Sequence, residues 1–181
     1  RLLSILLLNR VICLTELDRA HEALPDIERI LALPADATGR GIMSSGFETL
    51  AIAALSAGDV TLGADLVERA HAAPAAPDPD EQVERVIAAA MLDQARGQLV
   101  QALRRLQPMQ AMVGGDGVSG LNLRLRCRFF LMLAGVHEAL NDPAAALAAM
   151  REWQRLQIER AELASRANDA ASTGRSRRRP R

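Results

Sequence analysis

Small residues recur along this chain at a nearly constant interval, and this repeat constrains the fold more than any other feature. They are Ala23, Gly63, Ala102 and Ala146, which are 40, 39 and 44 residues apart. A repeat of this length is typical of helical solenoids, in which each unit buries its apolar face only against its neighbours. The sequence therefore predicts an array of similar units, with the small residues where two paired helices touch.

The positions around the small residues repeat as well. Four and seven residues after them lie the apolar side chains of one helix face, namely Ile27, Val67, Leu106 and Met150, then Ile30, Ala70, Met109 and Trp153. Twelve and sixteen residues before them lie Val11, Ala51, Ala90 and Ala134, then Leu7, Phe47, Val86 and Phe130. Turn-forming residues separate the two sets at Leu17-Asp18, Gly58-Asp59, Gly97-Gln98 and Asn141-Asp142. Each unit is therefore predicted to be a hairpin of two antiparallel helices, over residues 3–34, 43–74, 81–112 and 121–157.

Composition supports an all-α fold. The chain has 181 residues, 49% of them hydrophobic, and contains no Tyr and only four aromatic residues. Alanine and leucine, which favour helices, take the place of the aromatic and β-branched residues that favour strands. Residues 121–129 alternate apolar and polar side chains as a strand would, but no partner strand is evident elsewhere, so we expect a helix there.

Prolines and aspartates mark several expected helix boundaries. Asp78-Pro79 and Asp142-Pro143 each combine a capping side chain with a proline at the first helical position. Pro25 and Pro108 would fall inside second helices, where proline removes a hydrogen bond, so we expect local irregularity at both.

The second unit resembles the tetratricopeptide repeat (TPR) superfamily. The residues that carry the resemblance are Phe47, Leu50, Ala51, Ala54, Gly58-Asp59, Gly63, Val67, Ala70 and Pro74. The resemblance implies a right-handed solenoid of about four repeats over residues 1–157, followed by a long C-terminal helix. It also implies a concave groove lined by the first helices, which would expose Thr15, Glu16, Glu48, Glu84, Gln94, Arg128 and Glu138.

TPR arrays bind proteins and peptides, so the resemblance implies a non-catalytic interaction or sensory input module. Acidic side chains outnumber basic ones among the expected groove residues, which favours a basic or amphipathic partner segment. The hairpin from Asn141 to Trp153, followed by a charged helix, resembles the junction in bacterial signalling proteins whose TPR region precedes a diguanylate cyclase domain. The helical ligand-sensing arm of a transcription activator is the alternative.

A seam with alternating steps of three and four continues beyond the last repeat, at Trp153, Leu156, Arg160, Leu163, Ala167 and Ala170. This seam, which includes an arginine, predicts a helical extension over residues 158–171. Two interpretations stay open, namely self-association through this helix and a polar cap over the last repeat.

Charge is distributed unevenly. All 22 basic residues are arginines, and five of them lie at positions 175, 177, 178, 179 and 181, which leaves residues 1–171 with 17 arginines, 22 acidic residues and a formal charge of −5. Residues 172–181 lack apolar anchors, so we expect an arginine-rich disordered tail. Contact with nucleic acid through this tail is an alternative function, although the acidic body disfavours it.

Catalytic and metal-binding patterns are absent from the sequence. His21, His71 and His137 are isolated, and no nucleophile or phosphate-binding motif is present. Cys13 and Cys127 are expected to be buried apolar residues. We therefore expect no enzyme activity, no cofactor and no metal. No apolar run reaches the length of about 20 residues needed to cross a bilayer; we expect no membrane partner and a cytoplasmic location, with the periplasm open if residues before Arg1 are missing.

Overall fold

The computed structural model describes residues 2–33, 46–73, 78–115 and 121–176, with side chains as far as residue 166. Within these ranges the chain forms only helices and turns, so the all-α prediction is confirmed for the part described. The elements are α1 (Leu2–Glu16), a 3₁₀ turn η1 (Ala20–Ala23), α2 (Leu24–Leu31), α5 (Phe47–Ser56), α6 (Val60–Ala72), α7 (Pro79–Ala95), α8 (Leu99–Leu106), a 3₁₀ turn η2 (Gln107–Met109), α9 (Gln110–Gly114), α10 (Leu123–Ala139) and α11 (Pro143–Ser176).

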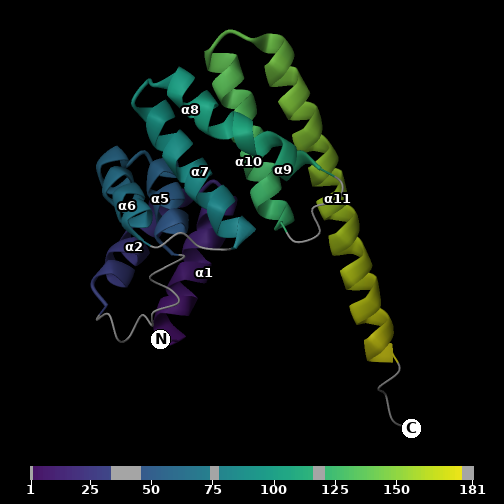
Figure 1. The fold of residues 1–181 in the computed structure, drawn as a ribbon. Coiled ribbons are helices and arrows are strands. Elements are labelled where there is room, and N and C mark those ends of the chain that lie inside the picture. Colours follow the sequence, from purple (N-terminus) through teal and green to yellow (C-terminus); the bar gives the residue numbers. More distant parts are fainter. Residues whose placement is uncertain (1, 34–45, 74–77, 116–120, 177–181) are drawn as a thin grey trace. The chain divides into compact units, whose positions relative to one another are not determined.

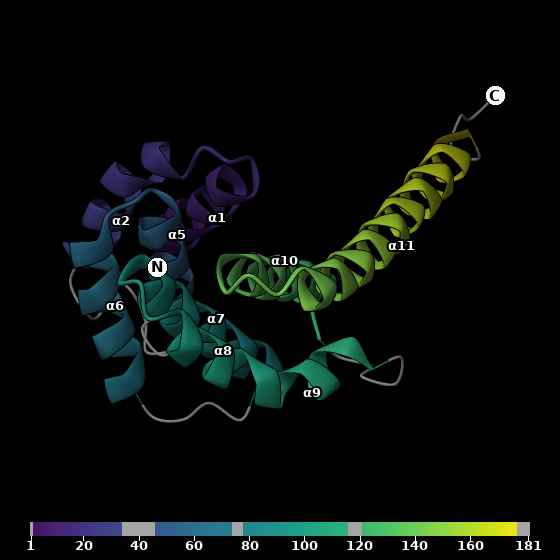
Figure 2. The same cartoon turned by 90° about the horizontal axis from the view of Figure 1, so that it is seen from above.

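The helices belong to two compact units, residues 1–121 and residues 122–181. In the first unit α1 packs on α2, α5 on α6 and α7 on α8. The first helices of these hairpins also touch one another in order, because α5 contacts both α1 and α7 (Figures 1 and 2). The second unit is the hairpin of α10 and α11, in which α11 continues far beyond its partner (Figure 1). Residues 123–129, whose apolar and polar side chains alternate like those of a strand, lie in α10 and are helical, as expected.

Four hairpin turns share one backbone geometry. Asp18, Gly58, Gly97 and Asn141 have positive φ angles of 55°, 84°, 74° and 61°. In each turn the next residue donates its N–H to the carbonyl five positions earlier, with N···O distances of 2.9, 3.0, 2.8 and 2.9 Å in chain order. A left-handed residue with this hydrogen bond is a common helix ending. The four turns are 40, 39 and 44 residues apart, the same spacing as the small residues of the sequence repeat.

The predicted helix boundaries are confirmed where the structure describes them. Asp78 Oδ1 accepts a hydrogen bond from the N–H of Asp80 at 2.9 Å, and Asp142 Oδ1 accepts one from the N–H of Ala145 at 3.1 Å. Pro25 lies in the first turn of α2, directly after η1, and Pro108 lies in η2. Pro108 therefore lies within a 3₁₀ segment, and Pro25 lies two residues after one, so the expected local irregularity is found beside both prolines.

Most positions of the repeated columns are buried in the first three hairpins, while Phe47, Val86 and Met109 are half-buried. Ala23 and Ala102 are fully buried, and so are Val11, Ala51 and Ala90 twelve residues before the small positions. The last hairpin differs, because Ala146 is half-buried and Met150 is 37% exposed. There α11 buries Ala149 and Leu156 instead, so its contact face is turned by about one residue from the one that the repeat predicts.

Two further expectations need correction. Cys13 is exposed, because α1 buries Ser4, Leu7, Val11 and Leu14 on the opposite face, whereas Cys127 is buried as expected. Helix α11 extends to Ser176, so it includes residues 172–176 of the expected disordered tail, since extending an existing helix costs little per residue. Residues 177–181 lie outside the described part.

Within the described part, no helix combines the length and apolar character needed to cross a bilayer.

Gly63 provides a direct test of helix contact at a repeat position. A Cβ atom at Gly63 would lie 2.5 Å from both Cγ and Cδ2 of Leu55 on α5. Alanine normally stabilises a helix by about 1 kcal/mol relative to glycine, but overpacking costs about 1–3 kcal/mol. We expect Gly63→Ala to lower the unfolding free energy measured in urea by about 1 kcal/mol. Gly63→Ala in a Leu55→Ala background should instead be stabilising, and destabilisation in both backgrounds would contradict the contact.

Candidate functional site

Three of the seven residues predicted to line an exposed groove are buried. Thr15, Glu48 and Glu84 are buried, Glu16, Gln94 and Arg128 are half-buried, and only Glu138 is exposed. Thr15 donates its hydroxyl to the carbonyl of Val11 in its own helix at 2.8 Å. The prediction is therefore wrong for Thr15, Glu48 and Glu84, because it assigned them to a solvent-facing surface of the first helices.

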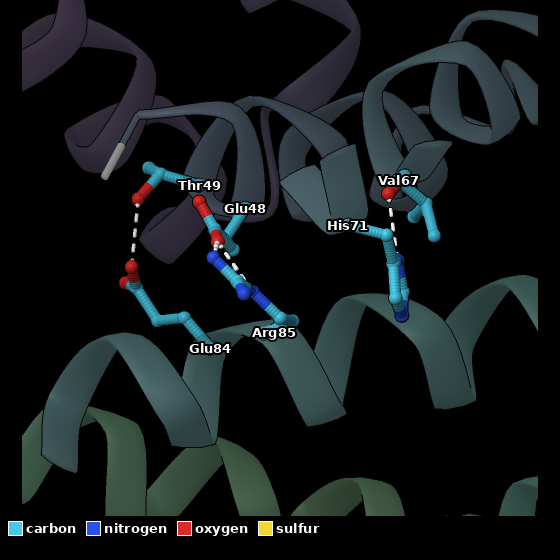
Figure 3. Close-up of polar contacts among 6 residues, drawn as sticks. All are labelled: Glu48, Thr49, Val67, His71, Glu84 and Arg85. Carbon is cyan, nitrogen blue, oxygen red and sulfur yellow. Dashed lines mark hydrogen bonds and ion pairs between the residues drawn. The ribbon is translucent and has the colours of Figure 1, made fainter. Parts of the chain in front are cut away.

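Glu48 and Glu84 join successive first helices. Arg85 on α7 donates Nε and Nη2 to Oε1 of Glu48 on α5, at 2.9 and 2.7 Å. One residue later on α5 and one residue earlier on α7, Thr49 Oγ1 donates to Glu84 Oε2 at 3.0 Å (Figure 3). Every residue of α5 from Glu48 to Ala54 is buried, so this helix has no solvent-facing side over that stretch. The two glutamates therefore hold neighbouring hairpins together.

A groove does exist on the other side of α7, between α6 and α8. Its two ends are open cavities of about 430 and 450 Å³, which share Ala89 and Arg105 as lining residues. The first cavity is lined by Ala64, Asp65, Val67, Glu68, Ala89, Leu92, Asp93, Arg96 and Arg105. The second is lined by His71, Gln82, Arg85, Val86, Ala89, Arg104, Arg105, Pro108 and Met109. We refer to these residues together as the α6–α8 groove. It lies wholly within the first unit.

Buried carboxylates position two of the groove's arginines. Arg85 is held by Glu48, whose side chain is fully buried, and Arg105 donates Nε to Oδ2 of buried Asp93 at 2.6 Å. The side chains of Arg85 and Arg105 remain 19% and 38% exposed. Ion pairs to buried acids restrict a flexible side chain and so prepare it for a ligand. Arg104 is exposed and makes no ion pair within the described residues.

His71 presents one ring nitrogen to the groove. Its Nδ1 lies 2.8 Å from the carbonyl oxygen of Val67, one helical turn earlier (Figure 3). A carbonyl can only accept, so Nδ1 carries a proton and Nε2 is the nitrogen left for other contacts. Neither cavity is lined by a serine, threonine, cysteine or tyrosine. The groove therefore offers charge and apolar surface, without a hydroxyl or thiol nucleophile beside the histidine.

Charge differs between the two ends of the groove. Asp65 and Glu68 on α6 line the first cavity, where Asp65 also pairs with Arg69 at 2.9 Å. Arg85, Arg104 and His71 line the second. Across the described residues, no three His, Cys, Asp or Glu side chains are grouped as a metal site would require.

Sequence reasoning missed this groove because it took the first helices as the binding surface. The groove residues of α6 lie one, two, four, five and eight positions after Gly63, and Arg104 and Arg105 lie two and three after Ala102. These columns flank the buried face of the second helices. Comparing their charges between units would have revealed the cluster of Arg104 and Arg105.

Comparison of the chain with protein-family models, with curated proteins and with solved structures finds no match.

Proposed function

We propose that the hairpins form a TPR-like array of helical repeats. Three features support this proposal. The four turns repeat at the spacing of the small residues, the first helices α1, α5 and α7 pack in chain order, and the residues twelve positions before the small ones are buried. Within the first unit, successive hairpins thus pack on one another, as solenoid repeats do.

The array serves, on this proposal, as a protein- or peptide-binding module, and the α6–α8 groove is its binding surface. The observation that carries the proposal is a groove made by three helices from two successive hairpins, with cavities at both ends. Grooves between helices accept extended or helical peptide segments, with apolar anchors in the pockets and polar groups at the rim. The absence of hydroxyl and thiol side chains from both linings favours binding over catalysis.

Peptide display tests the binding proposal. The full chain is immobilised, random peptides displayed on phage are selected on it, and the enriched peptides are titrated by fluorescence anisotropy. We expect dissociation constants in the micromolar range and a loss of at least about tenfold for Ala64→Trp, which fills the groove wall on α6. The matched control is Thr61→Trp, an exposed position of the same helix outside both linings. Equal loss in both variants, or no enriched peptide, would contradict the proposal.

A further inference from the structure

We propose that the partner segment of the α6–α8 groove is acidic and carries an apolar anchor residue, with its carboxylates facing Arg85, Arg104 and Arg105. This inference rests on the proposed function and names the chemistry of the partner at the same groove. It reverses the expectation of a basic partner, which depended in part on Glu48 and Glu84, two acidic residues that are buried between helices.

The anchor would enter the second cavity, which combines apolar and cationic side chains. Val86 and Ala89 from α7 and Pro108 and Met109 from η2 line it. Val86 and Met109 are half-buried, so their side chains remain accessible to a ligand. A cavity of about 450 Å³ has room for one large apolar side chain and adjoining backbone. Methionine adapts its shape to different side chains, which suits a pocket that binds short segments.

The arginines beside this pocket have donors to spare. A guanidinium group has five N–H donors. Arg85 uses Nε and Nη2 toward Glu48, Arg105 uses Nε toward Asp93, and Arg104 makes no hydrogen bond or ion pair within the described residues. Carboxylates match the planar fork of arginine. The carboxylate of an acidic residue next to the apolar anchor can therefore pair with Arg104. It can also accept hydrogen bonds from the N–H donors of Arg85 or Arg105 that Glu48 and Asp93 leave unused.

The same charges disfavour a continuous polyanion such as nucleic acid. Glu48 and Asp93 neutralise Arg85 and Arg105, and Asp65 and Glu68 line the other end of the groove together with Arg96. A phosphate at every nucleotide would meet these carboxylates a short distance from the arginines. A peptide can place its acidic residues at the arginine end alone. Charge complementarity thus favours a short acidic and apolar segment.

Two peptide libraries test the inference directly. Both contain eight-residue peptides with Leu or Met at the centre and Ser or Gly as neutral residues; one adds Asp and Glu, and the other adds Lys and Arg. We expect the full chain to enrich the acidic library, and Arg104→Glu to weaken the enriched peptides at least about tenfold. Arg29→Glu, which reverses an exposed arginine outside the groove, should change the affinity less than twofold. Met109→Ala should weaken binding several-fold without changing the preference for acid.

The outcomes separate this inference from the proposed function. Enrichment of basic or uncharged peptides whose affinity falls in Ala64→Trp would overturn the acidic preference and leave the binding proposal standing. Acidic peptides whose affinity is unchanged in Arg104→Glu would also overturn the inference, because they would bind elsewhere. A single-stranded oligonucleotide that binds more tightly than the acidic peptides, and is lost in Arg104→Glu, would overturn it in favour of nucleic acid. Enrichment from neither library would contradict both proposals. Circular dichroism at 222 nm shows whether each variant is folded.

Discussion

Replacing Arg85 with methionine is expected to lower the free energy of unfolding by about 3 kcal/mol, the typical cost of breaking a buried ion pair from one side. Arg85 supplies both hydrogen bonds that Oε1 of Glu48 receives. Among the described residues no donor reaches the other oxygen, Oε2, and the side chain is fully buried. The substitution would therefore leave a carboxylate inside the protein without a partner.

Urea unfolding followed by circular dichroism at 222 nm measures this loss, with the midpoint and the slope fitted separately. Arg69→Met is the matched control, because Arg69 pairs with Asp65 one helical turn away and both side chains are almost half exposed. Exposed pairs contribute less than about 1 kcal/mol. A loss for Arg85→Met no greater than that for Arg69→Met would show that the joint between α5 and α7 contributes little.

A double variant distinguishes the ion pair from the packing around it. Glu48→Met combined with Arg85→Met removes both charges and keeps side chains of similar length. Because replacing both partners of a buried pair is often neutral or stabilising, we expect the double variant to be at least 2 kcal/mol more stable than Arg85→Met alone, about the size of the unpaired-charge penalty. If both variants are equally destabilised, the loss comes from packing by the arginine stem.

The predictable part of this fold depends on neighbours in sequence. Asp78 and Asp142 cap helices through hydrogen bonds to residues two and three positions away, and Pro25 and Pro108 disturb the helix at their own sites. Likewise Gly58 and Gly97 adopt a backbone conformation that glycine adopts readily. Such effects are local, so the residue types indicate them without knowledge of the tertiary fold.

Predictions failed where the outcome depends on a residue from another helix. Glu48 has the sequence character of a surface residue, but Arg85, which holds it inside, lies 37 positions away on α7. No periodic pattern within α5 indicates that pairing. The groove was missed for another reason, because the prediction took the first helices as the binding surface, whereas Arg104 and Arg105 belong to the second helix α8. The family resemblance supplied a groove surface, and the burial of α5 contradicts it.

The second helices also carry a contact column that the repeat pattern did not reveal. Three residues after the small positions lie Asp26, Leu66, Arg105 and Ala149. Leu66 and Ala149 are buried apolar residues, while Asp26 pairs with Arg10 at 2.8 Å and Arg105 with Asp93. Because the four residues differ in chemistry, the column has no common apolar character. Asp26 and Arg105 nevertheless contact the first helix of their own hairpins through these ion pairs.

Leu66→Ala is the second large effect that we expect, a loss of about 3 kcal/mol in unfolding free energy. Leu66 is fully buried in α6, which packs against both α5 and α7. Truncating a buried leucine removes its transfer free energy and leaves a cavity, at a cost of about 2–5 kcal/mol. The wall formed by α5 is already packed around Gly63, where Leu55 occupies the space beside the backbone. The helices therefore have little freedom to close the cavity.

Val100→Ala on α8 is the control, because Val100 is 55% exposed and its truncation should cost less than about 0.5 kcal/mol. Hydrogen exchange adds a spatial readout. If α5 to α8 act as successive repeats, Leu66→Ala should increase the rate of amide exchange in α5, α6 and α7 more than in the α10–α11 hairpin. Solenoid repeats are coupled mainly to their nearest neighbours. Equal acceleration in α5–α7 and in α10–α11 would mean that the chain unfolds as one cooperative block, and would contradict the repeat array on which the binding proposal depends.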